Sequence, residues 1–254
     1  MLYFLNGGER ELLYQAITFI VVVLFFDSLE RRRPGFSVHR SRDLPLNLLA
    51  LLIVIVAGEM WKALLLSGLN ALNLGKVIFL ASLHRLPGTI KIILGLILAD
   101  ASLYWVHRAM HRPGLWRTHT FHHSVREIWW LSGSRTSLMH LLLFAVPQVF
   151  LGYFLLELAP WEAGVAFSLA GIVNIWIHTN LWVNLGPVGR IIITPNYHRI
   201  HHGAKGFSAK NLGSIFTIWD KMFGTYVDPQ SIEKDIAIGS VSTSKRLFRM
   251  IVGL

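Results

Sequence analysis

Long apolar segments dominate the sequence, and they restrict its fold more than any other feature does. A hydrocarbon core about 30 Å thick needs roughly 20 helical residues to cross it. Five segments have that length, and we predict that they form membrane-spanning helices at about residues 12–30, 44–66, 88–107, 138–158 and 161–180. A weaker apolar stretch at 72–83 is predicted to be re-entrant or interfacial. The predicted fold class is therefore an all-α, polytopic integral membrane protein.

The composition supports a membrane location and disfavours several other classes. Of the 254 residues, 53% are hydrophobic and 15% are charged, whereas an ordinary soluble domain carries about 25% charged residues. So apolar a chain argues against nucleic-acid binding, despite its net charge of +10. Cysteine is absent, which excludes a disulfide framework, a thiolate metal site and a thiol nucleophile. Any metal ion must be bound by nitrogen or oxygen.

Arginine and lysine residues in the short loops predict the sidedness. The loop after the second span offers only Lys76 and Arg85. The loops after the first span and between the third and fourth spans hold many more: Arg31, Arg32, Arg33, Arg40, Arg42, Arg108, Arg112, Arg117, Arg126 and Arg135. Because such residues concentrate on the cytoplasmic side, we expect an outside N-terminus and a cytoplasmic catalytic face. A bacterial inner membrane is favoured, with the endoplasmic reticulum as the alternative.

The chain is expected to form a single membrane domain over residues 1–254. Within it we expect a histidine-rich catalytic region at 100–226 and a soluble cytoplasmic tail at 227–254. The first residues lack the pattern of a cleavable signal peptide, so the first apolar segment is expected to remain as a helix.

Histidine clusters are the strongest functional signal. HRAMH contains His107 and His111, HTFHH contains His119, His122 and His123, and HRIHH contains His198, His201 and His202. Residues three or four apart share one face of a helix, so each cluster is expected to direct its imidazoles into one volume. Imidazole binds iron, copper, nickel and zinc, and eight donors exceed what one ion accepts, which predicts a two-metal site. A tight hairpin at 158–160 would return His178 to the same surface as a ninth ligand.

Other polar and aromatic residues are predicted to support this site. Asp100 and Asp220 are candidates to accept the second ring N–H of a ligating histidine, and Asn180 and His140 are further candidates for contacts with the ligands. His39 and His84 fall outside the pattern. Trp129 and Trp130 follow the second cluster and are candidates to line a substrate site, whereas the remaining tryptophans suit an interfacial aromatic belt.

The motifs HRAMH, HTFHHS, HTN and HRIHH, followed by NLGSIFTIWDKMFGTY, resemble the fatty acid hydroxylase and sterol desaturase superfamily over about residues 100–226. The resemblance implies membrane helices capped by a cytoplasmic di-iron centre whose ligands are the nine histidines named above. It implies two iron ions, O₂ as co-substrate, and hydroxylation of an unactivated C–H bond in a fatty acyl, sterol or related lipid. Desaturation on the same site is the alternative. The family often has an Arg-x-His-Pro-x-x-Glu-like stretch where this chain has Arg135-Thr136-Ser137, which bears on the substrate subfamily.

Hydroxylation needs external electrons, and the sequence has neither a Gly-rich dinucleotide fingerprint nor cysteine for an iron–sulfur cluster. We therefore expect a separate reductase or electron-transfer protein, and an acidic carrier would suit the basic face. No general base or nucleophile beyond the metal centre is required. A zinc hydrolase is disfavoured because no cluster has the HExxH pattern. A metal transporter is disfavoured because its ligands should lie near the bilayer midplane. The oligomeric state stays open.

Overall fold

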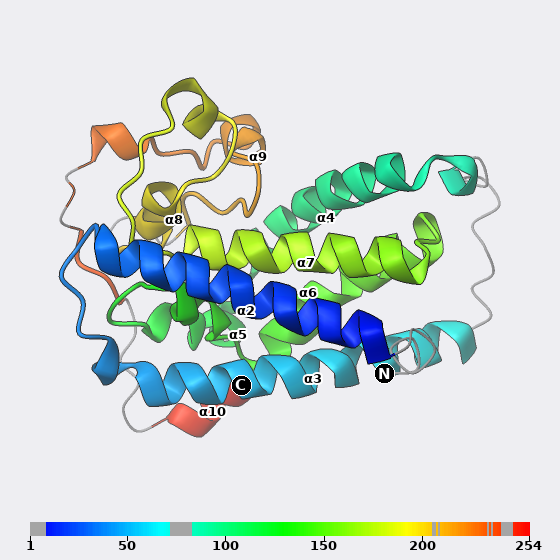
Figure 1. The fold of residues 1–254 in the computed structure, drawn as a ribbon. Helices are drawn as coiled ribbons and strands as arrows, with labels where there is room; N and C mark the ends of the chain where they lie inside the picture. Colours follow the sequence, from blue (N-terminus) through cyan, green and yellow to red (C-terminus); the bar gives the residue numbers. More distant parts are fainter. Residues whose placement is uncertain are drawn as a thin grey trace.

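The computed structural model describes residues 9–71, 83–204, 207, 209–232, 234, 236–239 and 246–254. Within this part the chain is helical and forms no strands, apart from two isolated β-bridges. The long helices are α2 (Glu9–Arg32), α3 (Leu44–Ala71), α4 (Gly88–Met110), α6 (Leu138–Val149) and α7 (Pro160–Ile177). They run lengthwise through the molecule, and the short helices α5 (Trp116–His119), α8 (Pro195–His201) and α9 (Ile218–Met222) gather at one end (Figure 1).

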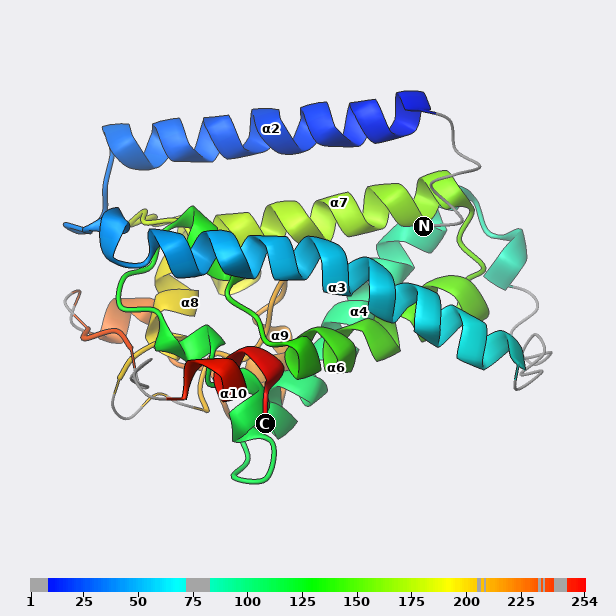
Figure 2. The ribbon, with the colours of Figure 1, turned by 90° about the horizontal axis from the view of Figure 1, so that it is seen from below.

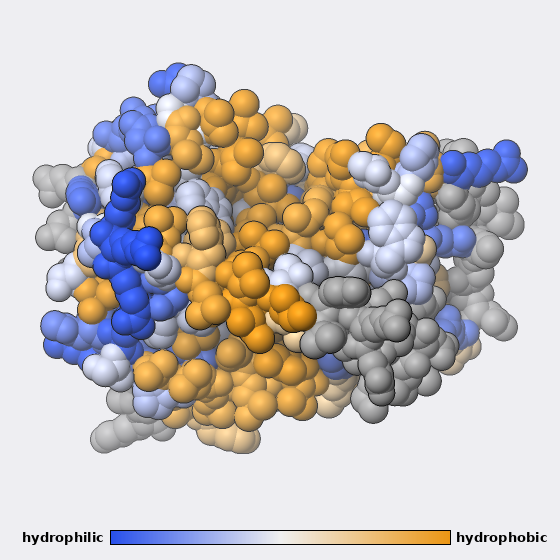
Figure 3. Space-filling view, viewed as in Figure 1, coloured by the Kyte–Doolittle hydropathy of each residue, from blue (hydrophilic) through white to orange (hydrophobic). Residues whose placement is uncertain are grey.

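Four helical segments of the described part are long and apolar enough to cross a membrane: Leu44–Ala71, Gly88–Met110, Leu138–Leu155 and Pro160–Ile177. Their apolar side chains face mainly outward, and hydrophobic surface covers the middle of the molecule in Figure 3. Outward-facing apolar surface on this scale suits lipid as the surrounding solvent. The chain is therefore an integral membrane protein.

The first predicted span, 12–30, corresponds to α2, which has 24 residues but is not among those four segments. Figure 2 shows α2 along one edge of the bundle, beside α7. The count of five spans stays a prediction. Residues 72–82 of the predicted re-entrant stretch lie outside the described residues.

The predicted span at 138–158 is not one continuous α-helix. Here α6 contains Pro147 and ends at Val149, and a π-helical segment, η6 (Phe150–Leu155), follows it. Proline lacks the N–H that an α-helix needs, so the turns around it must adjust. Beyond η6, Glu157 has a left-handed φ of 42°, and α7 begins at Pro160. The two helices form the antiparallel hairpin that brings the end of α7 back to the start of α6.

Polar contacts tie the end of α2 to the short segments at the same end of the bundle. Glu30 Oε1 accepts hydrogen bonds from the backbone N–H groups of Trp130 (2.8 Å) and Asn180 (2.7 Å). Its Oε2 lies 2.6 Å from Arg40. The carboxylate thus joins η5 (Trp130–Ser134), the residues after α7 and the chain that leads into α3.

The C-terminal helix α10 (Leu247–Val252) packs against this body. Met250 is buried with Ala50 of α3 and Phe121. The soluble, cytoplasmic character expected for residues 227–254 stays a prediction.

Candidate metal centre

Nine imidazoles lie together where α4 and α7 end, and they are the nine predicted from the sequence. Those of the first group, which we call the five-histidine group, are His107, His111, His119, His123 and His201. Those of the second, the four-histidine group, are His122, His178, His198 and His202. Within each group, one nitrogen atom per residue lies within 4.8 Å of the others, a spacing at which one metal ion could be held.

Each group draws on several elements, and two motifs serve both. The turn η4 (His122–Ser124) supplies His122 to the four-histidine group and His123 to the five-histidine group. Similarly, α8 supplies His201 to one group, while His202, which caps α8, belongs to the other. The expectation that each motif directs its imidazoles into one volume is wrong for HTFHH and HRIHH, because neighbouring residues project about 100° apart around a helix.

Four of these histidines have an Nδ1 atom close to a backbone carbonyl oxygen. The distances are 2.7 Å for His107 and Leu212, 3.0 Å for His122 and Arg135, 2.8 Å for His178 and Asn174, and 3.0 Å for His201 and Lys210. A carbonyl oxygen can accept but cannot donate, so each Nδ1 carries the proton. Each Nε2 atom is then left with a lone pair, which is the form that binds a metal.

Those bare Nε2 atoms face other imidazole nitrogens inside the groups. His122 and His178, both protonated on Nδ1, have Nε2 atoms 3.4 Å apart. His111 Nε2 is buried and has no hydrogen-bond partner among the described residues. Lone pairs directed at each other repel unless a cation lies between them, so the donor set fits a metal ion in each group.

Burial keeps these imidazoles neutral. It lowers the pKa of His111 to about 2 and that of His178 to about 4. Burial also lowers the pKa of His119, His122, His123, His198, His201 and His202 well below the ordinary value of 6.5. Desolvation disfavours the charged form of an imidazole, and the neutral form is the metal ligand.

Asp100 was predicted to accept from a histidine ring, but its hydrogen bonds go elsewhere. Its carboxylate accepts from the backbone N–H groups of Ser214 (3.2 Å), Ile215 (2.8 Å) and Phe216 (2.9 Å), and from the indole N–H of Trp219 (2.8 Å). This carboxylate in α4 therefore anchors the loop before α9, and no described histidine donates to it.

Asp220 has a similar role on the other side of that loop. It accepts from the N–H groups of Leu212 (2.8 Å) and Gly213 (2.7 Å) and from the hydroxyl groups of Tyr197 (2.7 Å) and Thr225 (2.6 Å). Leu212 is the residue whose carbonyl faces His107. Asp220 thus holds the backbone that orients an imidazole. The predicted hydrogen bond from a histidine ring to Asp220 is not present among the described residues.

The other two predicted supporting residues differ from each other. His140 lies against the five-histidine group, with its Nδ1 3.2 Å from His119 Nδ1. Asn180 contacts no described imidazole, and its side chain donates to the Phe36 carbonyl at 2.9 Å. Asn180 therefore secures the segment that follows α7, whereas His140 is a tenth imidazole at the centre.

Arg135 is a site residue whose role sequence reasoning missed, since it counted there as a cytoplasmic surface charge. Its side chain is fully buried, pairs with Asp43 at 3.2 Å, and donates to Asn47 Oδ1 and the Ser124 carbonyl, each at 3.0 Å. Its own carbonyl faces His122. No local signal distinguishes a buried arginine from a loop arginine, because its partner lies 92 residues earlier in the chain.

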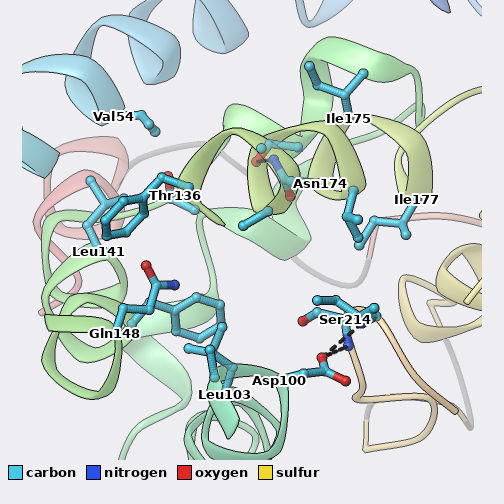
Figure 4. A pocket seen from close by; sticks show the side chains of 18 of the residues that line it. Val54, Asp100, Leu103, Thr136, Leu141, Gln148, Asn174, Ile175, Ile177 and Ser214 are labelled. Atoms are coloured by element: carbon cyan, nitrogen blue, oxygen red, sulfur yellow. Dashed lines mark hydrogen bonds between the residues drawn. The ribbon is translucent and has the colours of Figure 1, made fainter. Parts of the chain in front are cut away.

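An apolar cavity of about 370 Å³ lies between α3, α4, α6 and α7 and reaches both histidine groups. Figure 4 shows side chains from these helices, among them Leu103, Leu141 and Ile175, around the space. The histidines in its wall are His107, His119, His122, His140, His178 and His198. Trp130 also lines it, and its predicted contact with substrate stays a prediction. Trp129 is buried elsewhere, with the Arg40 guanidinium 5.1 Å from its ring centre.

A second cavity, of about 600 Å³, lies between α2, α3, α6 and α7. It shares wall residues with the first, including Phe19, Val54, Phe144 and Gln148. The two are therefore neighbouring chambers of one space that extends from the histidines along the bundle.

Residues 92–225 match the profile of the fatty acid hydroxylase family, which covers more than half of the chain. The human alkylglycerol monooxygenase is 33% identical over 129 residues, 50% of this chain and 28% of that protein. An ornithine lipid hydroxylase of Rhizobium tropici is 32% identical over 151 residues, 56% of this chain and 44% of that protein.

A more distant relative is a sphinganine C4-monooxygenase of Arabidopsis thaliana, 28% identical over 148 residues, 57% of this chain and 56% of that protein. The chain thus matches between about a quarter and just over half of the length of these relatives. No solved structure matches the chain. The matched region contains every histidine of both groups.

Proposed function

The chain belongs to the fatty acid hydroxylase family, and on that premise we propose that it is an O₂-dependent membrane lipid hydroxylase with one iron ion in each histidine group. The observation that carries the proposal is the position of the two groups in the wall of an apolar cavity within the membrane bundle. The relatives' names, monooxygenases of alkylglycerol and sphinganine and a hydroxylase of ornithine lipid, support a lipid as the substrate.

The donor set suits iron. Five nitrogens in one group and four in the other leave room for further ligands on a metal that accepts up to six. When bound, a pair of iron ions supplies O₂ reduction coupled to oxidation of a C–H bond. All described donors are neutral nitrogens, and Asp100, a carboxylate in the cavity wall, already accepts four hydrogen bonds. A zinc hydrolase is disfavoured because such sites keep an available carboxylate base nearby.

The protein's own residues hold the imidazole ligands in place and orient the substrate. The carbonyls of Leu212, Lys210, Arg135 and Asn174 fix the imidazole rings through their Nδ1–H groups. Phe144 packs its ring edge-on against His107 and His140, beside which it lines the cavity. The apolar walls exclude water and confine an acyl chain or ring, so that the substrate presents one region to the centre.

Electrons must come from outside the described machinery, since oxygen insertion consumes O₂, two electrons and two protons per hydroxyl group formed and releases water. We propose that an acidic carrier docks at the histidine end, on the cytoplasmic side. Exposed arginines there include Arg31, Arg32, Arg33, Arg42, Arg112, Arg117 and Arg126. Association of such a pair should weaken as salt increases.

The test combines metal analysis with lipid mass spectrometry. Protein purified without added metal should contain iron in both groups and should consume O₂ when a reductant and membrane lipids are supplied. A product heavier by one oxygen supports hydroxylation, and a product lighter by two hydrogens would identify a desaturase. Zinc without O₂ consumption would overturn the proposal.

A cavity variant separates substrate binding from metal binding. Ala170 of α7 lines the cavity, and Val165 of the same helix is exposed and lines neither cavity. Ala170→Phe should fill part of the cavity and reduce turnover at unchanged iron content, whereas Val165→Phe should have little effect. Equal turnover in the two variants would argue that the cavity does not hold the substrate.

A further inference from the structure

Gln148 of α6 lines both cavities, at the place where they meet. In Figure 4 its side-chain amide projects into the space, on the same side as Leu141. The amide makes no hydrogen bond with any residue that the structure describes. A polar group therefore faces a largely apolar space without a partner among the described residues.

Several other polar side chains of the spans have partners. Ser102 donates to the Leu98 carbonyl at 2.8 Å, and the ammonium of Lys91 lies 2.6 Å from Glu162. Asn174, on the opposite wall of the same cavity, donates to the Gly133 carbonyl at 3.3 Å. Gln148 departs from this pattern although its position in a membrane helix makes an unpaired amide costly.

We propose that Gln148 is a specificity-determining residue that hydrogen-bonds with an oxygen-bearing group of the bound lipid and so selects the carbon that reaches the histidines. The inference rests on the proposed lipid hydroxylase function and adds the polar feature that the substrate must carry. An amide both donates and accepts, so it suits an uncharged hydroxyl, ether, ester or amide group.

The position of Gln148 on α6 sets how far the lipid's oxygen-bearing group lies from the histidine groups. Gln148 follows His140 by eight residues on one helix, which corresponds to about 12 Å along the axis. His140 touches the five-histidine group. The lipid oxygen that Gln148 binds and the carbon that is oxidised are therefore separated by several carbon–carbon bonds. A lipid bound in this register presents one stretch of its chain to the metal centre, whereas an unanchored chain can slide.

The test replaces the amide by a side chain of similar size that cannot hydrogen-bond strongly, Gln148→Met. Iron-loaded protein in detergent is offered hexadecanol and hexadecane in competition, and the bound species are quantified by native mass spectrometry. The wild type should prefer the alcohol, and the variant should lose roughly three- to tenfold of that preference, as expected for one neutral hydrogen bond. Val146→Ala is the matched control, because Val146 lies on α6, is exposed and lines neither cavity.

A second measurement examines the products. With a membrane lipid extract, Gln148→Met should retain its iron and yield a broader distribution of hydroxyl positions than the wild type does. Unchanged alcohol preference together with unchanged positions would overturn the inference. If no protein oxidises any lipid but the variant alone loses the alcohol preference, the polar subsite stands and the proposed hydroxylase function fails.

Discussion

The two histidine groups lie side by side, yet different parts of the molecule hold them. In the five-histidine group, His107 and His201 donate to carbonyls of Leu212 and Lys210, in the loop between α8 and α9. In the four-histidine group, His122 donates to Arg135 beside η5, and His178 donates within its own helix, α7.

The anchors of these supports also differ. Asp100 and Asp220 hold the loop that serves the five-histidine group. The pair of Arg135 with Asp43 holds the segment that serves the four-histidine group. Since different residues make the two supports, a substitution in one should weaken one group more than the other. The predictions below test that separation.

The largest effect is expected from removing a histidine that belongs to a single group. His201→Ala should abolish metal binding by the five-histidine group, and His202→Ala, at the adjacent residue, that of the four-histidine group. Each variant should lose about half of its iron, and activity should fall to background because both ions are needed. Elemental analysis and O₂ uptake measure this. His39→Ala is the control, since His39 is exposed and lies outside both groups. Full iron in either variant would contradict the assignment.

A large loss of stability is expected from Arg135→Met. The substitution leaves Asp43 buried without its closest charge partner, which typically costs about 3–5 kcal/mol. Arg126 also pairs with Asp43, at 3.3 Å, but its side chain is 58% exposed, so Arg126→Met should cost less than about 1 kcal/mol. The unfolding temperatures of the two variants in detergent measure this difference. Equal shifts would mean that burial of Arg135 does not matter.

Asp220→Asn is expected to lower metal affinity moderately, and mainly in the five-histidine group. The amide retains one acceptor oxygen, so some of the four hydrogen bonds that Asp220 accepts, two of them from the loop backbone, are lost. Residues that orient ligands typically contribute about 10- to 100-fold in metal affinity, and the loss should fall on the five-histidine group. Chelator competition measures the affinity of each site. Asp228→Asn, which changes the cap of η8 (Pro229–Ser231), is the control. Equal weakening of both groups would argue against separate supports.

The smallest loss of metal affinity is expected from Gly133→Ala, and it should occur in the four-histidine group. A Cβ atom there would lie 2.7 Å from His178 Nδ1 and 2.9 Å from Asn174 Nδ2, so the imidazole must shift. Crowding in a packed site costs about 1–3 kcal/mol, and a single methyl group should cost near the lower end of that range. The cost should weaken metal binding by the four-histidine group alone. At Gly114 a Cβ would meet no atom within 4 Å, which makes Gly114→Ala the control. Unaltered metal affinity in Gly133→Ala would show that His178 has room to move.

Much of the fold could be predicted because its signals are local. Apolar segments of about 20 residues specify membrane helices wherever they occur, and α3, α4 and α7 follow them closely. The sequence did not predict that α6 ends at Val149 and continues as a π-helical segment. Pro147 lies within a long apolar segment, and the apolar pattern alone predicts one continuous helix there. The nine histidines could be found because their spacing is short and their chemistry is specific.

The sequence by itself determined how many imidazoles the chain offers and at which end of its helices they gather. Tertiary structure decided how they divide, since neighbours such as His201 and His202 enter different groups according to the elements that pack around α8. It also decided which carbonyls orient the rings, why Arg135 is buried, and that Gln148 faces a cavity. These features depend on contacts between residues far apart in the chain, and backbone carbonyls and empty space have no side-chain signature in a sequence.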